Sequence, residues 1–533
     1  MTTTKQARNA IPVAEFLKGT PAVPRLLVAD AYTIGTGPHA SNDAKYNSVY
    51  HITPRRGFDK FLPKEFLADG RIVFAGLRRI LRDFFTKPVT MDEVDEAERF
   101  LATAHAGGTE YRFDRDLWVR VVKNCNGIIP IKIEAFEEGT TSFAYEPVVQ
   151  VTSAEGFGEL AGYFESKLLH LWSSSERITA LKWAFEYLRR GAAEAHPSWT
   201  NEQVEFAVSV MLHDFGDRAG VCSMESEVLG QAHLMVVPGT DTFSAAYLDW
   251  KENGETPFAC SIHALAHRTV MAYMRENDCH TALYRLGKVT GITAHVSDTY
   301  DYFKQVDWFG EMLSGKWKED TNLVVARPDS GDMVKCVKHV LAVCEKYGLY
   351  TTDPDTGLKM ATRLRWIQGD SVHWDTMIEV IHAVLQAGWS PYASGAFGIG
   401  GFLRNSISRD HAGTSMKLCA VGNGDRPAVK RSETSAKSSI PGVVKVIDNN
   451  GASDIATVFN VTEQTSGGNL LKVWYNGIGV KDLEHAFYPP ALETSSVIRE
   501  RIGSEFFRRA EPKSVLSEYL RGLRMKLFDT NSN

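Results

Sequence analysis

Short apolar runs alternate along this chain with longer segments whose apolar residues recur at helical spacing. The clearest unit is the run LVVA at 323–326, which is followed by the polar hexapeptide RPDSGD at 327–332. Pro328 and Gly331 favour a sharp turn, because proline cannot donate to a sheet and glycine tolerates unusual backbone angles. Valine, leucine and cysteine residues then recur every three or four positions until Gly348. The pattern predicts one strand, one polar loop and one helix.

The same order of strand, polar loop and helix recurs from about residue 160 onwards. Strands are predicted at 234–237 and 292–296, before the loops PGTDT and SDTYD, and the run LRWIQGD at 364–370 repeats the pattern. The carboxyl ends of parallel strands share one edge of a sheet, and ligands bind at that edge in α/β proteins. We therefore expect an α/β fold, a parallel barrel with polar loops gathered at one mouth.

Both ends of the chain have a different, β-rich pattern. The segment IKIEA at 131–135 alternates between apolar and polar residues, and PVVQV at 147–151 is also predicted to be extended. Helices are expected at 74–85 and 91–104, and the second begins with the capping-box sequence TMDE at 90–93. Beyond residue 412 the β character returns, and helices are predicted between 495 and 527.

Composition narrows the class of protein. A length of 533 residues allows two or three domains, and 44% hydrophobic with 23% charged residues is typical of a soluble globular protein. A net charge of −6 gives no electrostatic reason to expect nucleic acid as a partner. No apolar run approaches the roughly 18 residues of a membrane span, and the N-terminal sequence lacks the apolar core of a secretion signal. The seven cysteines are scattered without CxxC spacing, so we expect reduced thiols in a cytoplasmic protein.

A glycine-rich segment is the first candidate for ligand binding. The sequence GAFGIGG at 395–401 precedes a short helical pattern, and Arg409 follows it. Glycine turns expose backbone amides that bind anions, and an arginine adds a charged donor. Lys417 and Lys430 are candidates for the same anion. On these residues alone, a plain tight turn and solvated surface lysines explain the pattern equally well.

Four aspartates at strand ends are the second candidate. Asp298, Asp301, Asp329 and Asp370 are positioned to surround a magnesium-bound, phosphorylated sugar, because carboxylates suit Mg²⁺ and ribose hydroxyls. The alternative for each of them is an ordinary helix N-cap. His267 lies in the same series of loops, and a lone histidine at a helix start is most often structural.

Eight motifs in a fixed order resemble the nicotinamide phosphoribosyltransferase family. They are DAY at 30–32, HDFGDR at 213–218, GTDT at 239–242, SIHALAH at 261–267, SDTYD at 297–301, RPDSG at 327–331, IQGD at 367–370, and AFGIGG at 396–401 with RD at 409–410. No single motif is specific, but the ordered set is. The resemblance covers residues from about 26 to about 437 and weakens in the C-terminal hundred residues.

The resemblance implies a type II phosphoribosyltransferase fold. This fold is an incomplete parallel α/β barrel with an α+β domain built from both chain ends. We expect the α+β domain at 1–160 together with 420–533, and the catalytic barrel at 161–419. The family also implies a head-to-tail homodimer whose two active sites lie at the subunit interface. Its reaction, that of a pentosyltransferase in NAD salvage, joins nicotinamide to phosphoribosyl pyrophosphate.

The resemblance assigns residues to the nicotinamide pocket. Phe215 stacks on one face of the ring, and Tyr32 of the partner subunit stacks on the other. Asp30 and Arg218 line the same pocket. Asp241 accepts a hydrogen bond from the carboxamide, and its charge repels the carboxylate of nicotinic acid, so it favours nicotinamide.

The resemblance assigns the remaining family positions to catalysis and to binding of the phosphoribosyl group. The catalytic positions are His267, Asp329 and Asp301, and the family histidine is phosphorylated by ATP. Mg²⁺ is expected as a cofactor, held mainly by the substrate pyrophosphate and water. The positions implied to bind the ribose and its phosphates are Arg327, Gly369, Asp370, Ser297, Gly400, Gly401, Arg409 and Lys430.

Four positions depart from the family pattern. Ala266 precedes the histidine where an acidic residue is common, Ile399 and Phe402 are larger than usual in the glycine loop, and Thr53 replaces a basic residue. Arg55 and Arg56 are close enough in sequence to supply the missing charge.

Three other functions fit parts of the sequence. Nicotinate phosphoribosyltransferase is the nearest, and a comparison of the two pyridine substrates separates it. A magnesium-dependent phosphohydrolase using the same aspartates would release phosphate without any pyridine base. A non-catalytic binder of the nucleotide would not need the histidine.

Overall fold

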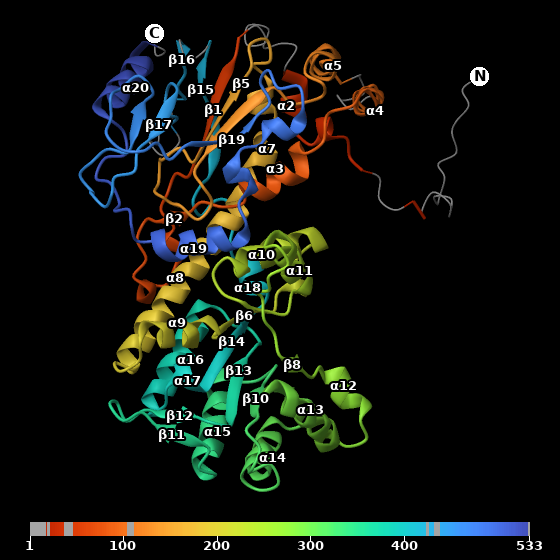
Figure 1. Cartoon of the computed structure of the whole chain (residues 1–533), viewed down its shortest axis with the longest axis vertical. Helices are drawn as coiled ribbons and strands as arrows, with labels where there is room; N and C mark the ends of the chain where they lie inside the picture. Colours follow the sequence, from red (N-terminus) through yellow and green to blue (C-terminus); the bar gives the residue numbers. More distant parts are fainter. Residues whose placement is uncertain are drawn as a thin grey trace.

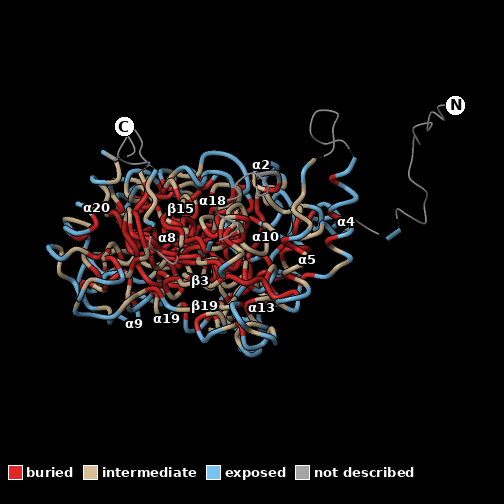
Figure 2. The backbone as a smooth tube through the Cα atoms, turned by 90° about the horizontal axis from the view of Figure 1, so that it is seen from above, coloured by how far each residue is buried: buried red, intermediate tan, exposed pale blue. Residues whose placement is uncertain are grey.

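The computed structural model contains two large sheets, one in each half of the molecule (Figure 1). It describes residues 17–18, 22–36, 46–103, 111–422, 426–430 and 438–530. Buried segments run through the middle of the molecule and exposed segments surround them (Figure 2). The long helix α8 (Leu171–Ala195) lies between the two sheets.

The first sheet combines strands from both ends of the chain. Its six strands lie in the order β16-β15-β1-β5-β3-β19, and each strand pairs antiparallel with its neighbours. The alternation predicted at 131–135 is present, because the burial of β3 alternates between buried and half-buried residues. The strands are β1 (Ser48–Thr53), β3 (Ile131–Ala135), β5 (Val149–Ser153), β15 (Ser415–Val421), β16 (Arg426–Pro427) and β19 (Lys472–Asn476).

Helices α3 (Leu77–Phe85), α4 (Met91–Leu101) and α5 (Arg115–Asn124) contribute apolar residues to the core of this sheet. The predicted capping box is confirmed: Thr90 Oγ1 accepts from the backbone N–H of Glu93, and the Glu93 side chain accepts from that of Thr90. The helices predicted between 495 and 527 are confirmed as α19 (Ser495–Glu505) and α20 (Glu518–Thr530). The expected domain limit at 419/420 falls inside β15, and the domain division stays a prediction.

The second sheet is parallel and contains seven strands in the order β7-β6-β14-β13-β10-β9-β8. Its two edges approach each other, because a single bridge joins Gly239 of β7 to Cys260, just before β8. An incomplete parallel barrel was expected, and the fold is confirmed. The strands are β6 (Leu212–Asp214), β7 (Gly239–Thr240), β8 (His263–Ala264), β9 (Ile292–Val296), β10 (Leu323–Arg327), β13 (Leu364–Gln368) and β14 (Gly395–Ile399).

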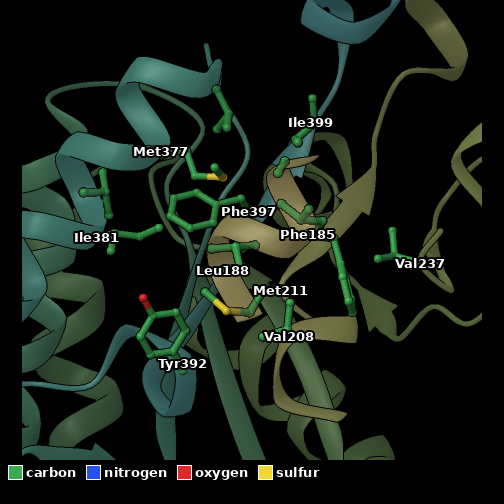
Figure 3. Packing of buried hydrophobic residues seen from close by; sticks show 14 of the residues in the cluster. Phe185, Leu188, Val208, Met211, Val237, Met377, Ile381, Tyr392, Phe397 and Ile399 are labelled. Atoms are coloured by element: carbon green, nitrogen blue, oxygen red, sulfur yellow. The ribbon is translucent and has the colours of Figure 1, made fainter. Parts of the chain in front are cut away.

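Helices cover the outside of this sheet. They are α13 (Glu276–Thr290), α14 (Tyr302–Ser314), α15 (Met333–Lys346) and α16 (Trp374–Gln386). Figure 3 shows Phe185 and Leu188 of α8 beside Phe397 of β14, and these residues belong to one buried cluster. Because β14 is anchored by this core, the loop that follows it starts from a fixed point.

The strand predicted at 234–237 is wrong. Helix α10 (Ser223–Leu234) continues to Leu234, and the strand β7 begins only at Gly239. Leu234, Met235 and Val237 are buried at or just after the end of this helix. A short apolar run does not distinguish that environment from a buried strand.

No helix in the described ranges is long and apolar enough to cross a membrane. All seven cysteines lie in those ranges, and each is a free thiol.

Candidate active site

A cavity of about 860 Å³ opens at the carboxyl ends of the parallel strands. Ten of the residues expected from the sequence line it, and they come from loops after β6, β7, β8, β10, β13 and β14. The cavity therefore lies at the mouth of the barrel, where parallel α/β folds bind ligands. The ten residues are Phe215, Arg218, Asp241, His267, Arg327, Asp329, Gly369, Asp370, Gly400 and Gly401.

The ring of Phe215 forms an aromatic wall of this cavity. It lies against the backbone of two glycines, since a Cβ on Gly398 would approach Phe215 Cδ2 to 2.1 Å and one on Gly369 would approach Cε2 to 3.2 Å. The backbone N–H of Phe215 donates to Ile399 O at 3.1 Å. The glycines at 369 and 398 thus make room for a ring that is fixed to β14 and available for stacking.

Asp241 supplies a carboxylate to the same cavity. Ser261 Oγ donates to Asp241 Oδ1 at 2.5 Å, and the backbone N–H of Asp241 donates to Asp214 O at 2.9 Å. One oxygen of the carboxylate is therefore oriented by the protein. The other accepts no hydrogen bond from the described residues and is available to a ligand donor.

His267 begins helix α12 (His267–Ala272) and lies between two carboxylates. Its Nε2 is 3.0 Å from Asp298 Oδ1, and its Nδ1 is 3.8 Å from Asp329 Oδ2. Ser330 Oγ donates to the other oxygen of Asp298 at 2.5 Å. The imidazole side chain is 37% exposed, so a ligand in the cavity can reach it.

The structure places Asp298, and not Asp301, beside the histidine. Asp301 is the N-cap of α14, where Oδ1 accepts from the backbone N–H of Lys304 at 3.1 Å. This hydrogen bond holds the pKa of the Asp301 carboxyl below its usual value. Asp301 does not line the cavity. Position within the motif SDTYD distinguishes the two, because Asp298 lies two residues after the end of β9 and reaches His267, whereas Asp301 directly precedes α14 and caps it.

Arg327 and Asp370 line the cavity from neighbouring strand ends. Arg327 Nη2 donates to Leu265 O at 3.3 Å, which directs the guanidinium across the mouth of the barrel. Ser371 Oγ donates to Asp370 Oδ2 at 3.1 Å. Asp329 and Asp370 are hard oxygen donors that fit Mg²⁺ when phosphate oxygens complete its coordination. Within the described residues, no group of three or more His, Cys, Asp and Glu side chains is arranged to hold a metal.

Ser297 does not reach the cavity. It is fully buried, its Oγ donates to His295 O at 2.7 Å, and its backbone N–H donates to Arg327 O at 3.0 Å. The residue fixes the end of β9 against β10. A contact between its side chain and a phosphoribosyl group is therefore not present in this geometry.

Asp30 and Tyr32 lie away from the cavity, at the start of helix α2 (Ala31–Thr36) near the first sheet. Tyr32 is 64% exposed. Partial burial and the neighbouring Asp30 carboxylate raise the pKa of its phenol. Neither residue belongs to the site of its own chain, so any contact they make with a cavity of this kind requires a second subunit.

Arg409 and Lys430 form a separate basic cluster with Arg55 and Lys417. Burial lowers the pKa of Lys417, and the positive charges of Arg55, Lys430 and Arg409 lower it further. Arg55 is held through its backbone N–H, which donates to Ala412 O at 2.8 Å. None of the four lines the cavity. Arg55 brings to this cluster a basic side chain close in sequence to Thr53, where the family has a basic residue.

Sequence reasoning missed three polar residues of the cavity. Asp217, Arg268 and His373 line it, and none was assigned a role. Two of them lie inside or directly beside a motif, HDFGDR and the loop that carries His267. Their position close to the end of a strand was the feature of the sequence that could have identified them as cavity residues.

Comparisons with known proteins agree with this geometry. Residues 210–463 match the nicotinate phosphoribosyltransferase (NAPRTase) family, and residues 26–133 match the N-terminal domain of nicotinamide phosphoribosyltransferase. A nicotinamide phosphoribosyltransferase from Xanthomonas campestris pv. campestris (strain 8004) is 31% identical over 357 residues, which are 65% of this chain and 73% of that protein. The chain belongs to the nicotinamide phosphoribosyltransferase family.

Two solved structures share the fold. The crystal structure of nicotinate-nucleotide pyrophosphorylase from Pyrococcus furiosus aligns with a TM-score of 0.55 and 16% identity, covering 94% of this chain and 99% of that one. Human nicotinic acid phosphoribosyltransferase aligns with a TM-score of 0.54 and 16% identity, covering 94% and 100%. At this identity, the likeness shows that the fold is shared and no more.

Proposed function

We propose that this protein is a nicotinamide phosphoribosyltransferase, which joins nicotinamide to phosphoribosyl pyrophosphate and releases pyrophosphate. The observation that carries the proposal is the pairing of Phe215 with the oriented carboxylate of Asp241 in one cavity. A flat aromatic ring stacks on the first, and an amide N–H donates to the second. Arg327, Asp329 and Asp370 provide the adjacent polar surface for the sugar and its phosphates.

The reaction needs alignment more than covalent help from the protein. The pyridine nitrogen attacks the anomeric carbon, a C–N bond forms, and the C–O bond to pyrophosphate breaks with both electrons leaving on oxygen. Phe215 and Asp241 hold the ring at the angle of attack, and Arg327 stabilises the departing charge. When bound, Mg²⁺ neutralises the pyrophosphate, and Asp329 and Asp370 are the carboxylates placed to hold it.

Asp241 also decides between the two pyridine substrates. Its carboxylate accepts from the amide of nicotinamide, whereas nicotinic acid would place a second negative charge beside it in a partly enclosed site. Nicotinate phosphoribosyltransferase remains the nearest alternative, because relatives with that activity share the fold.

We further propose that ATP is a coupled substrate and that His267 receives its terminal phosphoryl group. A ring nitrogen attacks the γ-phosphorus, an N–P bond forms, and ADP leaves with the electron pair of the broken P–O bond. His267 is exposed to the cavity and is oriented by Asp298, as a phosphoryl acceptor requires.

A cytoplasmic homodimer completes the proposal. Several exposed apolar side chains lie on the segments that surround the cavity. Val221 and Met224 follow the short 3-10 helix at Asp217–Ala219, Phe243 lies two residues after Asp241, and Met271 lies on α12. Exposed apolar groups of this kind mark interaction surfaces. In the head-to-tail dimer that we propose, Tyr32 of the partner subunit reaches this face.

One experiment tests the activity. Purified protein is mixed with phosphoribosyl pyrophosphate, Mg²⁺ and either nicotinamide or nicotinic acid, with and without ATP, and mononucleotide and phosphate are followed. We expect nicotinamide mononucleotide, with more product when ATP is present. Equal or faster use of nicotinic acid would overturn the role of Asp241. Phosphate release from phosphoribosyl pyrophosphate in a control that contains neither ATP nor a pyridine base would indicate a phosphohydrolase.

A further inference from the structure

A buried ion pair lies beneath the cavity. Arg404 Nη2 contacts both carboxylate oxygens of Asp214, at 3.1 and 2.8 Å, and the two side chains are 3% and 5% exposed. Arg404 Nε also donates to Gly216 O at 3.2 Å. The approach is close, since a Cβ on Gly216 would lie 2.5 Å from Arg404 Nε.

Asp214 connects two loops that line the cavity, one that carries Phe215 and one that carries Asp241. Its Oδ1 accepts from the backbone N–H of Gly216 at 2.9 Å, which fixes the peptide after Phe215. Its Oδ2 accepts from Thr242 Oγ1 at 2.8 Å, and its backbone oxygen accepts from Asp241 N at 2.9 Å. One residue therefore holds both the aromatic wall and the amide acceptor of the cavity.

Arg404 joins the third loop. It lies on α18 (Gly401–Asn405), whose first residue lines the cavity together with Gly400. Arg177 of α8 secures this short helix from the other side, with Nε donating to Leu403 O at 2.8 Å and Nη2 to Arg404 O at 2.7 Å. The strands before the three loops are adjacent in the order β7-β6-β14, and Asp214 ends the middle one.

We propose that Asp214 and Arg404 are positioning residues that set the distance between the ring-binding and phosphate-facing sides of the cavity. They do not line the cavity, and they act through Phe215, Asp241 and the Gly400–Gly401 turn. The inference rests on the proposed function, because the loops it joins are those that align a pyridine with a phosphoribosyl group. Displacement of one side relative to the other lowers the rate even when each loop stays folded.

The chain offers a matched control for a purely stabilising ion pair. Arg509 and Glu146 form a comparable buried two-point contact, from Nη1 to Oε2 at 2.9 Å and from Nη2 to Oε1 at 2.7 Å, with side chains 1% and 0% exposed. Arg509 also donates to Thr141 O at 2.7 Å, near the first sheet. None of these residues lines the cavity.

The test compares R404K with R509K in the full-length protein. Lysine keeps the charge but cannot reproduce the planar, forked contact of arginine. We expect a similar fall in the unfolding midpoint for both variants. R404K alone should lower kcat/KM for nicotinamide and for phosphoribosyl pyrophosphate, by about tenfold each, because small misplacements carry large rate costs in aligned reactions. Unchanged constants in R404K, or equal changes in R509K, would overturn the proposal.

A second, milder variant keeps the proposal testable if R404K does not fold. T242V removes one hydrogen bond to Asp214 and leaves the ion pair, so KM for nicotinamide should rise severalfold while KM for phosphoribosyl pyrophosphate stays unchanged. Wild-type values for both substrates would count against the positioning role.

Amide hydrogen exchange gives a readout that does not depend on activity. R404K should speed exchange at Gly216 and Asp241, and R509K should not; identical exchange patterns would contradict the proposal. Absence of mononucleotide formation by the wild-type protein would instead refute the proposed function, while the exchange comparison still decides the role of the pair.

Discussion

The imidazole of His267 contacts the carboxylate of Asp298 through Nε2 at 3.0 Å, and Ser330 holds the opposite oxygen of that carboxylate. This fixes the orientation of the ring and leaves Nδ1 on the side of Asp329. A carboxylate that orients a histidine also stabilises the ring when it gains positive charge.

His267→Ala should abolish stimulation by ATP while leaving basal mononucleotide synthesis measurable, because the phosphoryl acceptor is lost but the ring pocket stays intact. Initial rates with and without ATP give the answer. His263→Ala is the control, since His263 is an exposed imidazole of the preceding strand that does not line the cavity. Undiminished stimulation in the His267 variant would refute the phosphohistidine.

Asp298→Asn should reduce the ATP-dependent rate by at least about tenfold, because the amide no longer stabilises the charged ring. Asp301→Asn should leave that rate unchanged and lower only the thermal midpoint, since Asp301 caps a helix. The two variants are compared by steady-state kinetics and thermal melts. A larger kinetic effect at Asp301 would show that our assignment within the SDTYD motif is reversed.

Asp241→Asn should shift substrate preference toward nicotinic acid. The amide removes the like-charge repulsion while keeping the size of the side chain, so we expect the ratio of kcat/KM values to change by about tenfold or more. Competition between the two pyridines measures the ratio. Ser261→Ala, which frees the carboxylate without removing its charge, should change preference much less.

Mixing inactive Tyr32→Ala and Phe215→Ala subunits should regenerate part of the wild-type activity. In a shared site, each mixed dimer contains one cavity with both aromatic residues intact. The control is either variant alone, and dimer exchange is verified by differential tagging. Mixed dimers that form and remain inactive would show that the tyrosine acts within its own chain or not at all.

Stability should depend on pH through Glu176, a buried residue of α8. Burial raises the pKa of this carboxyl from 4.5 to about 8, and Asp410 adds to the rise, while the backbone N–H of Ala412 and the Arg177 charge oppose it. A raised folded pKa contributes stability that is fully present below 4.5 and is lost as pH rises through about 8. As the pH rises from 4.5 through about 8, Glu176→Gln should therefore become more stable relative to the wild type.

Urea unfolding of both proteins from pH 5 to pH 9 measures this difference. The free energies of unfolding of the two proteins should converge toward the acidic end, with the variant more stable relative to the wild type at the basic end. A difference that does not vary with pH would mean that Glu176 is ionised in the folded protein throughout.

Much of the site was visible in the sequence, because strand ends in a parallel sheet must converge. The run at 323–326 became β10 with Arg327 at its end, and the motif loops met at one cavity. Local patterns failed where one side chain had two possible roles, as for Ser297 and Asp301. The contact between Asp214 and Arg404 could not be predicted from the sequence, because 190 positions separate the two residues and no local pattern connects them.

The order of strands in the first sheet has a consequence for synthesis of the protein. Strands β1, β5 and β3 are adjacent and complete by residue 153, but their outer neighbours β15 and β19 begin only at Ser415 and Lys472. A growing chain therefore holds a three-stranded sheet with two unpaired edges while the whole barrel emerges. Unpaired edges invite pairing with other chains. Chains that stop after the barrel should aggregate through these edges, whereas the last strands of the full-length protein close both.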